Sequence, residues 1–259
     1  MRPEQSQQSA EGILYLVAVP IGHPDDITVR AIRILRDADL IASENPAATR
    51  RLLAHHGIEA TLTSYGPSNV EEKAAVLIER LRRGARIALV SDCGSPVIAD
   101  PGSVLVASAH ARGIPVASIP GASALTAALA AAGMATDTVI FLGQLPDTKP
   151  AIRRRLARYL IAKIPAVAFC ATGALASTLN AVEELTPRDR IMLACDLTTP
   201  HERILRGTVP RVRRLLEGTR AAQDVTLILM GKNRRGMKSP QNERVHRDQS
   251  PSSRRINTR

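Results

Sequence analysis

The chain has 259 residues, enough for one large domain or two smaller ones with a buried core. Its net charge is +11, and with no Trp, two Phe and three Tyr its interior must be filled by Ala, Val, Leu and Ile. That composition favours a parallel sheet covered by helices. The three cysteines are odd in number and widely spaced, a pattern that indicates neither a disulfide framework nor a CxxC metal site and favours free thiols in a reducing cytoplasm. The longest apolar stretch, 117–134, is interrupted by Pro and Gly and is not predicted to span a membrane.

Short apolar runs alternate with amphipathic patterns in the first part of the chain. The runs predict strands at 13–19, 39–43, 60–65, 86–91 and 114–121. The amphipathic patterns predict helices from Asp25 or Asp26 onward and at 47–57, 71–84 and 102–113. This βαβα order predicts a doubly wound α/β domain.

The pattern changes after Pro120, where an Ala-rich helix is predicted at 121–133. Further strands are predicted at 138–146, 166–172, 190–197 and 224–231, with helices at 151–163 and 176–185. We therefore expect two α/β domains, at 12–125 and 126–231, each with a mostly parallel or mixed sheet flanked by helices. Residues 1–11 and 232–259 lack apolar periodicity and are predicted to be disordered, and the second segment is a basic tail.

Three loops rich in Gly and Pro follow predicted strands: "VPIGHPDDIT", "SDCGSPVIADPG" and "IPGASALT". In open α/β sheets, ligands bind beyond the carboxyl ends of the strands, and Gly allows the backbone to approach a ligand closely. For any one loop, the better interpretation is that Pro and Gly only mark turns of the fold, but the three loops together favour a ligand pocket. The chain has no GxGxxG, GxxxxGK[ST], HExxH or GxSxG motif, and His55 and His56 are predicted to be solvated, so no metal site is expected.

Several segments, in order, resemble one known family: "LYLVAVPIGHPDDITVRAIRIL", "ADLIASEN", "ALVSDCGSPVIADPG", "IPGASALTAALAAAG", "FLGQLP" and "LRGT". They are similar to the ribosomal RNA small subunit methyltransferase I family of the tetrapyrrole methylase superfamily, over about residues 13 to 231. The resemblance implies two α/β domains with S-adenosylmethionine in the cleft between them, and a homodimer. It also implies methyl transfer to the 2′-oxygen of a cytidine ribose in small-subunit ribosomal RNA.

The resemblance also implies site residues. Those expected to bind the cofactor are Pro20, Ile21, Gly22, Cys93, Gly94, Ser95, Ile98, Ser123, Ala124 and Cys170. Glu44 and Asp100 are the candidates for assisting the acceptor hydroxyl, because each follows a predicted strand. His23 and His201 are alternatives. A carboxylate such as Asp92 or Asp100 would also favour the cationic sulfonium, although both could equally cap a turn or a helix.

Some polar groups of the family pattern are missing from this chain. "ENPA" at 44–47 stands where the family has an acidic-Asp-Thr-Arg run, and "FCATGA" at 169–174 replaces Tyr-Glu-Ser-Pro-His-Arg. Two alternatives therefore stay open: a methyltransferase acting on a tetrapyrrole or another small molecule, and a relative without catalytic activity. The tail, with a net charge of +7 from nine Lys or Arg and two Asp or Glu, would add affinity for RNA phosphates or would simply be solvated.

Overall fold

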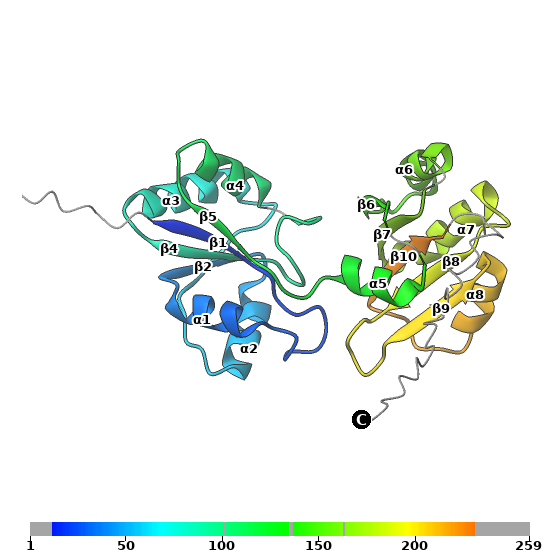
Figure 1. Cartoon of the computed structure of the whole chain (residues 1–259), viewed down its shortest axis with the longest axis horizontal. Helices are drawn as coiled ribbons and strands as arrows, with labels where there is room; N and C mark the ends of the chain where they lie inside the picture. Colours follow the sequence, from blue (N-terminus) through cyan, green and yellow to red (C-terminus); the bar gives the residue numbers. More distant parts are fainter. Residues whose placement is uncertain (1–11, 101, 135–136, 163, 231–259) are drawn as a thin grey trace, which may run out of the picture.

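The computed structural model describes residues 12–230 apart from 101, 135–136 and 163. Two five-stranded sheets organise this part of the chain, and Figure 1 shows them side by side, joined by the segment that leads into α5 (Ala124–Ala132). The predicted N-terminal segment 1–11 and basic tail 232–259 lie outside the described residues. Among the helices described, none is both long and apolar enough to cross a membrane.

The first sheet is parallel and has the strand order β3-β2-β4-β1-β5. Its strands are β1 (Ile13–Val17), β2 (Leu40–Ser43), β3 (Leu62–Ser64), β4 (Arg86–Val90) and β5 (Val116–Ile119). The helices α1 (Val29–Asp37) and α2 (Pro46–His55) lie on one face, and α3 (Val70–Arg82) and α4 (Ser103–His110) lie on the other (Figure 1). Each face has its own apolar core, so the inner strands β2 and β4 are buried on both sides, as their apolar runs predict.

The second sheet is mixed, with the order β6-β7-β10-β8-β9. Its strands are β6 (Ile140–Gln144), β7 (Ala166–Ala171), β8 (Ile191–Cys195), β9 (Arg203–Gly207) and β10 (Asp224–Leu229). Only β6 and β7 pair in parallel; the other pairings are antiparallel. One face packs against α5, and the other packs against α6 (Lys149–Ala162), α7 (Leu175–Leu185) and α8 (Val209–Leu216). The predicted α/β class, with helices flanking parallel and mixed sheets, is thus confirmed.

Three details differ from the sequence-based expectation. The first helix begins at Val29 rather than at Asp25 or Asp26, because the Thr28 hydroxyl accepts a hydrogen bond from the Ala31 amide (3.1 Å) and caps it there. The elements β9 and α8 were not predicted, because arginines interrupt their apolar patterns. The expected domain boundary between residues 125 and 126 falls inside α5, and the division into two domains stays a prediction.

Candidate functional site

The three Gly- and Pro-rich loops meet at the carboxyl edge of the first sheet. Loop 1 (residues 19–28) and loop 2 (residues 91–100) are joined by a bridge in which Val19 and Gly94 exchange backbone hydrogen bonds of 2.9 and 3.1 Å. The Ser91 hydroxyl donates to the carbonyl of Gly94 (3.1 Å) and holds the bend. Loop 3 (residues 120–123) passes so close to β1 that a Cβ on Gly121 would lie 3.0 Å from the Cβ of Ala18. The loops therefore form one continuous surface.

Loop 2 has an unusual backbone. Gly94 has a φ of 73°, and two residues with side chains, Val97 and Ala99, also have positive φ values, of 74° and 65°. A β-branched residue rarely adopts this conformation, which costs about 1–3 kcal/mol. Strain of this kind concentrates at binding and catalytic sites. Its backbone conformation therefore makes loop 2 a candidate for ligand binding or catalysis.

A cavity of about 230 Å³ lies between the two sheets. It brings together most of the cofactor-binding residues expected from the sequence, together with Asp100: Ile21, Cys93, Gly94, Ser95, Ile98, Ser123, Ala124 and Cys170. Pro20 and Gly22 line an adjoining groove, which also contains Ser91 and Asp92. Gly94, Ser95, Ser123 and Ala124 in this lining have small side chains, a feature that allows a ligand to approach the backbone closely.

The second sheet supplies cavity residues that the sequence analysis did not single out. They are Gln144, Phe169, Ala171, Ala194, Leu197, Gln223, Asp224, Val225 and Thr226. Gln144 and Phe169 lie at or near the carboxyl ends of β6 and β7, so the rule that located the three loops could also have located them. Phe169 is held in place by edge-to-face contact with Phe141, at 5.2 Å between ring centroids.

Asp196 positions part of this second wall. It is buried, its φ is 49°, and its Oδ1 accepts hydrogen bonds from the amides of Gln223 (2.7 Å) and Asp224 (3.1 Å). Its own amide donates to the carbonyl of Asp224 (2.9 Å). One carboxylate therefore fixes the beginning of β10 against the loop that follows β8.

Loop 1 also contacts the loop that follows β8. A Cβ on Gly22 would lie 2.4 Å from the carbonyl oxygen of Leu197, so only glycine permits this approach. Next to it, the amide of His23 donates to the hydroxyl of Thr198 (2.9 Å). Gly22 therefore allows loop 1 to approach the loop after β8 at a point beside the cavity. It does not line the cavity itself.

Burial and neighbouring carboxylates raise the pKa values of two acidic side chains at and near the cavity. Asp100 is half-buried, and its burial, reinforced by the charges of Glu44 and Asp92, raises its pKa to about 7. Burial, and then Asp92, also raises the pKa of Glu44, although Glu44 is not among the residues that line the cavity. Asp100 can therefore exchange a proton near neutral pH, a property suited to acid–base chemistry.

Comparison with known proteins identifies the family. Residues 13–213 match the family model for tetrapyrrole (corrin/porphyrin) methylases. The chain belongs to the tetrapyrrole methylase family. The cavity is therefore a candidate cofactor site of a tetrapyrrole methylase, and the resemblance noted from the loops is confirmed.

Relatives and solved structures agree with this assignment. The ribosomal RNA small subunit methyltransferase I of Halalkalibacterium halodurans is 41% identical over 211 residues, which cover 81% of this chain and 73% of that protein. The protein of the same name from Thermotoga maritima is 36% identical, with 85% and 99% covered. Uroporphyrin-III C-methyltransferase from Thermus thermophilus, complexed with S-adenyl homocysteine, has a TM-score of 0.57 at 21% identity, with 84% and 97% covered. At that level of identity, the structural match speaks for the shared methylase fold alone.

Proposed function

We propose that this protein is an S-adenosylmethionine-dependent methyltransferase that methylates the 2′-oxygen of a cytidine ribose in small-subunit ribosomal RNA. The cavity between the two sheets, with three loops converging on it, is the observation that carries the proposal. Support for the RNA substrate comes from relatives that are 36–46% identical and named for small-subunit ribosomal RNA. A tetrapyrrole acceptor is suggested by the name of the matching family and by solved structures at about 20% identity, which are more distant than the relatives named for ribosomal RNA.

The residues present fit the proposed cofactor. The cavity is lined mainly by small and apolar side chains, with Phe169 on one wall and Asp100 on another. Gly94, Ser95 and Ala124 would leave room for backbone contacts, and the carboxylate of Asp100 would favour a cationic sulfonium. When bound, S-adenosylmethionine supplies an electrophilic methyl group.

Asp100 is the proposed group for activating the acceptor. Methyl transfer requires the acceptor oxygen to be held in line with the methyl group, and a ribose hydroxyl is a weak nucleophile until its proton is removed. A carboxylate with a pKa of about 7 is available to take that proton at neutral pH. Glu44 would act beside it by keeping that pKa high, which makes Glu44 a positioning residue in this proposal.

Cys170 has a different role. Burial raises the pKa of its thiol to about 12, so it stays protonated at neutral pH. The thiolate is the nucleophilic form of cysteine, so Cys170 would contribute shape to the cavity without competing for the methyl group.

The partners belong to the same proposal. A homodimer in the cytoplasm, with ribosomal RNA or the small ribosomal subunit as substrate, is the arrangement we propose.

Removing residues 232–259 would remove a net charge of +7, weaken RNA binding at low salt and leave cofactor affinity unchanged. Equal RNA affinity with and without this segment would show that it is merely solvated.

The deciding experiment is mass analysis of ribosomal RNA nucleosides from a strain lacking this gene. We expect one ribose methyl on a small-subunit cytidine to disappear, and to return with the wild-type gene but not with Asp100→Ala. Unchanged RNA, with S-adenosylmethionine still bound by the purified protein, would indicate a small-molecule acceptor. Unchanged RNA without cofactor binding would indicate a relative that has lost activity.

A further inference from the structure

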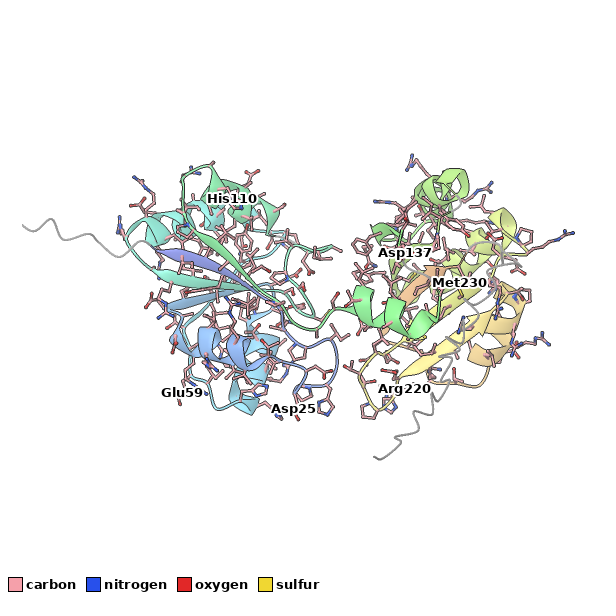
Figure 2. The ribbon with its side chains drawn as sticks, in the orientation of Figure 1. Asp25, Glu59, His110, Asp137, Arg220 and Met230 are labelled. Atoms are coloured by element: carbon pink, nitrogen blue, oxygen red, sulfur yellow. The ribbon has the colours of Figure 1, made fainter. Side chains whose placement is uncertain are left out.

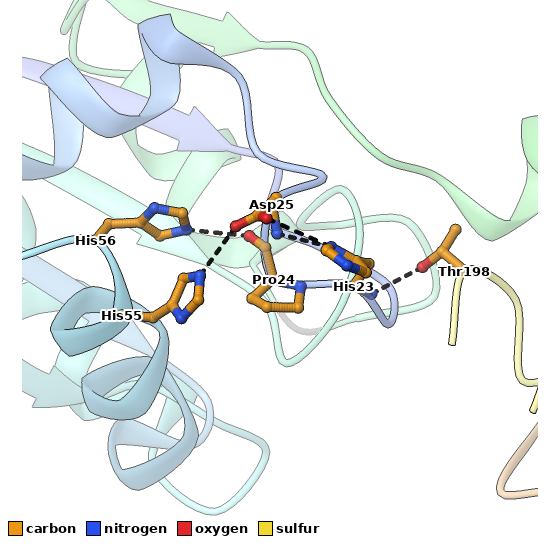
Figure 3. Close-up of polar contacts among 6 residues, drawn as sticks. All are labelled: His23, Pro24, Asp25, His55, His56 and Thr198. Carbon is orange, nitrogen blue, oxygen red and sulfur yellow. Dashed lines mark hydrogen bonds and ion pairs between the residues drawn. The ribbon is translucent and has the colours of Figure 1, made fainter. Parts of the chain in front are cut away.

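Three side chains with metal-binding chemistry meet beside loop 1, outside the cavity. His55 is the last residue of α2 and His56 is its C-cap, and both reach toward Asp25 and Pro24 of loop 1 (Figure 3). The Nε2 of His55 lies 2.9 Å from Oδ1 of Asp25, and the Nε2 of His56 lies 3.0 Å from the carbonyl oxygen of Pro24. The donor atoms of Asp25, His55 and His56 all lie within 4.8 Å of one another. Two imidazoles and a carboxylate therefore converge from two segments about thirty residues apart in sequence.

We propose that Asp25, His55 and His56 form a binding site for a divalent transition metal ion, with Zn²⁺ as the representative ion. Neutral imidazole and carboxylate are the ligands that Zn²⁺, Co²⁺ and Ni²⁺ accept in proteins. A tetrahedral Zn²⁺ with bonds of about 2.0–2.1 Å holds its ligand atoms about 3.3 Å apart. To reach this spacing, the His55–Asp25 pair, now at 2.9 Å, would open slightly, and the donor atoms that lie up to 4.8 Å apart would close in.

Two of the three side chains are exposed enough to make these movements. His55 and Asp25 are 48% and 67% exposed, so no packed core holds them, whereas the half-buried His56 would exchange its hydrogen bond to the Pro24 carbonyl for the ion. Three protein ligands leave one position open for water. His23 could also occupy it, since its Nδ1 lies 3.9 Å from Oδ2 of Asp25 (Figure 3).

The position of this site gives the ion a structural consequence. Loop 1 carries Ile21 into the cavity and is joined to the second sheet through the His23 amide and Thr198. An ion held by Asp25 and the end of α2 would fasten this loop to the first sheet. The ion would thereby fix one wall of the cavity and one contact between the sheets, without taking part in methyl transfer.

Direct titration of the full chain with Zn²⁺, in the absence of any cofactor, tests the proposal. We expect one ion per chain, and a loss of affinity of about tenfold or more in both His55→Ala and Asp25→Asn, because even outer partners of metal ligands contribute roughly ten- to hundredfold. The control is His110→Ala. His110 is an exposed histidine at the end of α4, on the opposite side of the first sheet from Asp25 (Figure 2), and it should leave the affinity unchanged.

A second measurement separates loss of ligand from loss of fold. Co²⁺ bound to nitrogen and oxygen ligands in a tetrahedral site absorbs strongly in the visible range, and His55→Gln should abolish this absorption while circular dichroism stays unchanged. The proposal is overturned if wild-type protein binds no Zn²⁺, or if binding survives in His55→Ala and Asp25→Asn. Because no cofactor or RNA is present, either result leaves the proposed methyltransferase activity untouched.

Discussion

Replacing Asp100 with Asn should make the protein more stable at alkaline pH. Burial and the charges of Glu44 and Asp92 raise the pKa of Asp100 from 3.8 to about 7, so its ionised form is disfavoured in the folded state. The folded chain keeps the Asp100 proton up to about pH 7, whereas an unfolded chain releases it near pH 4. The free energy of unfolding therefore falls as pH rises through this window, and the loss is complete above it.

The size of the effect follows from the same shift. Three pKa units correspond to about 4 kcal/mol as an upper limit. Asp100 is only half-buried, and screening by solvent should reduce the gain in Asp100→Asn to about 1–2 kcal/mol at pH 8. At pH 4, where wild-type Asp100 is protonated when folded, the gain should nearly vanish.

Urea unfolding of the wild type and Asp100→Asn at pH 4 and pH 8 measures this difference. Asp147→Asn, which removes an exposed carboxylate, is the matched control and should change little at either pH. A variant no more stable than the wild type at pH 8, or one with the same gain at both pH values, would show that the ionised Asp100 does not destabilise the fold. A stabilised variant that no longer transfers methyl groups would show that the charge is retained for function.

Three further predictions concern the interface and the cavity. Gly22→Ala should lower the melting temperature and weaken cofactor binding, because its methyl group would lie 2.4 Å from a backbone oxygen. The control Gly173→Ala, whose methyl group would have nothing within 4 Å, should leave the melting temperature unchanged. Asp196→Ala should reduce the free energy of unfolding by about 1–3 kcal/mol, because two backbone amides lose their acceptor; an unchanged urea midpoint would argue against that role. Affinity for S-adenosylmethionine should rise as pH increases through about 7, as Asp100 ionises, whereas S-adenosylhomocysteine, which lacks the sulfonium charge, should show no such rise in calorimetry.

The first wall of the cavity could be predicted from sequence because its signals are local. Gly94 and its neighbours follow a parallel strand, and the carboxyl ends of parallel strands share one edge of a sheet. The second wall is different. Asp224 and Thr226 belong to an antiparallel strand, for which the strand-end rule makes no prediction, and the role of Asp196 depends on contacts 27 and 28 residues away.

The cluster of Asp25, His55 and His56 could not be predicted from the sequence either. His55 and His56 look like solvated residues of an amphipathic helix, and nothing near them in sequence suggests a ligand set. Their partner Asp25 was expected to begin the first helix. Because Thr28 caps that helix instead, Asp25 stays in the loop and meets the end of α2. A displacement of the helix start by about one turn thus decides whether the cluster forms.

Calorimetric titration of S-adenosylmethionine into the wild type and Gly94→Val shows whether the cavity between the two sheets binds the cofactor. Gly94 has a φ of 73° and lines the cavity, so a β-branched side chain there would both strain loop 2 and occupy the space where backbone meets ligand. We predict one site per chain in the wild type and no measurable binding in a Gly94→Val protein that retains wild-type circular dichroism. Wild-type affinity in that folded variant, or no binding by the wild type, would contradict a cofactor site between the two sheets.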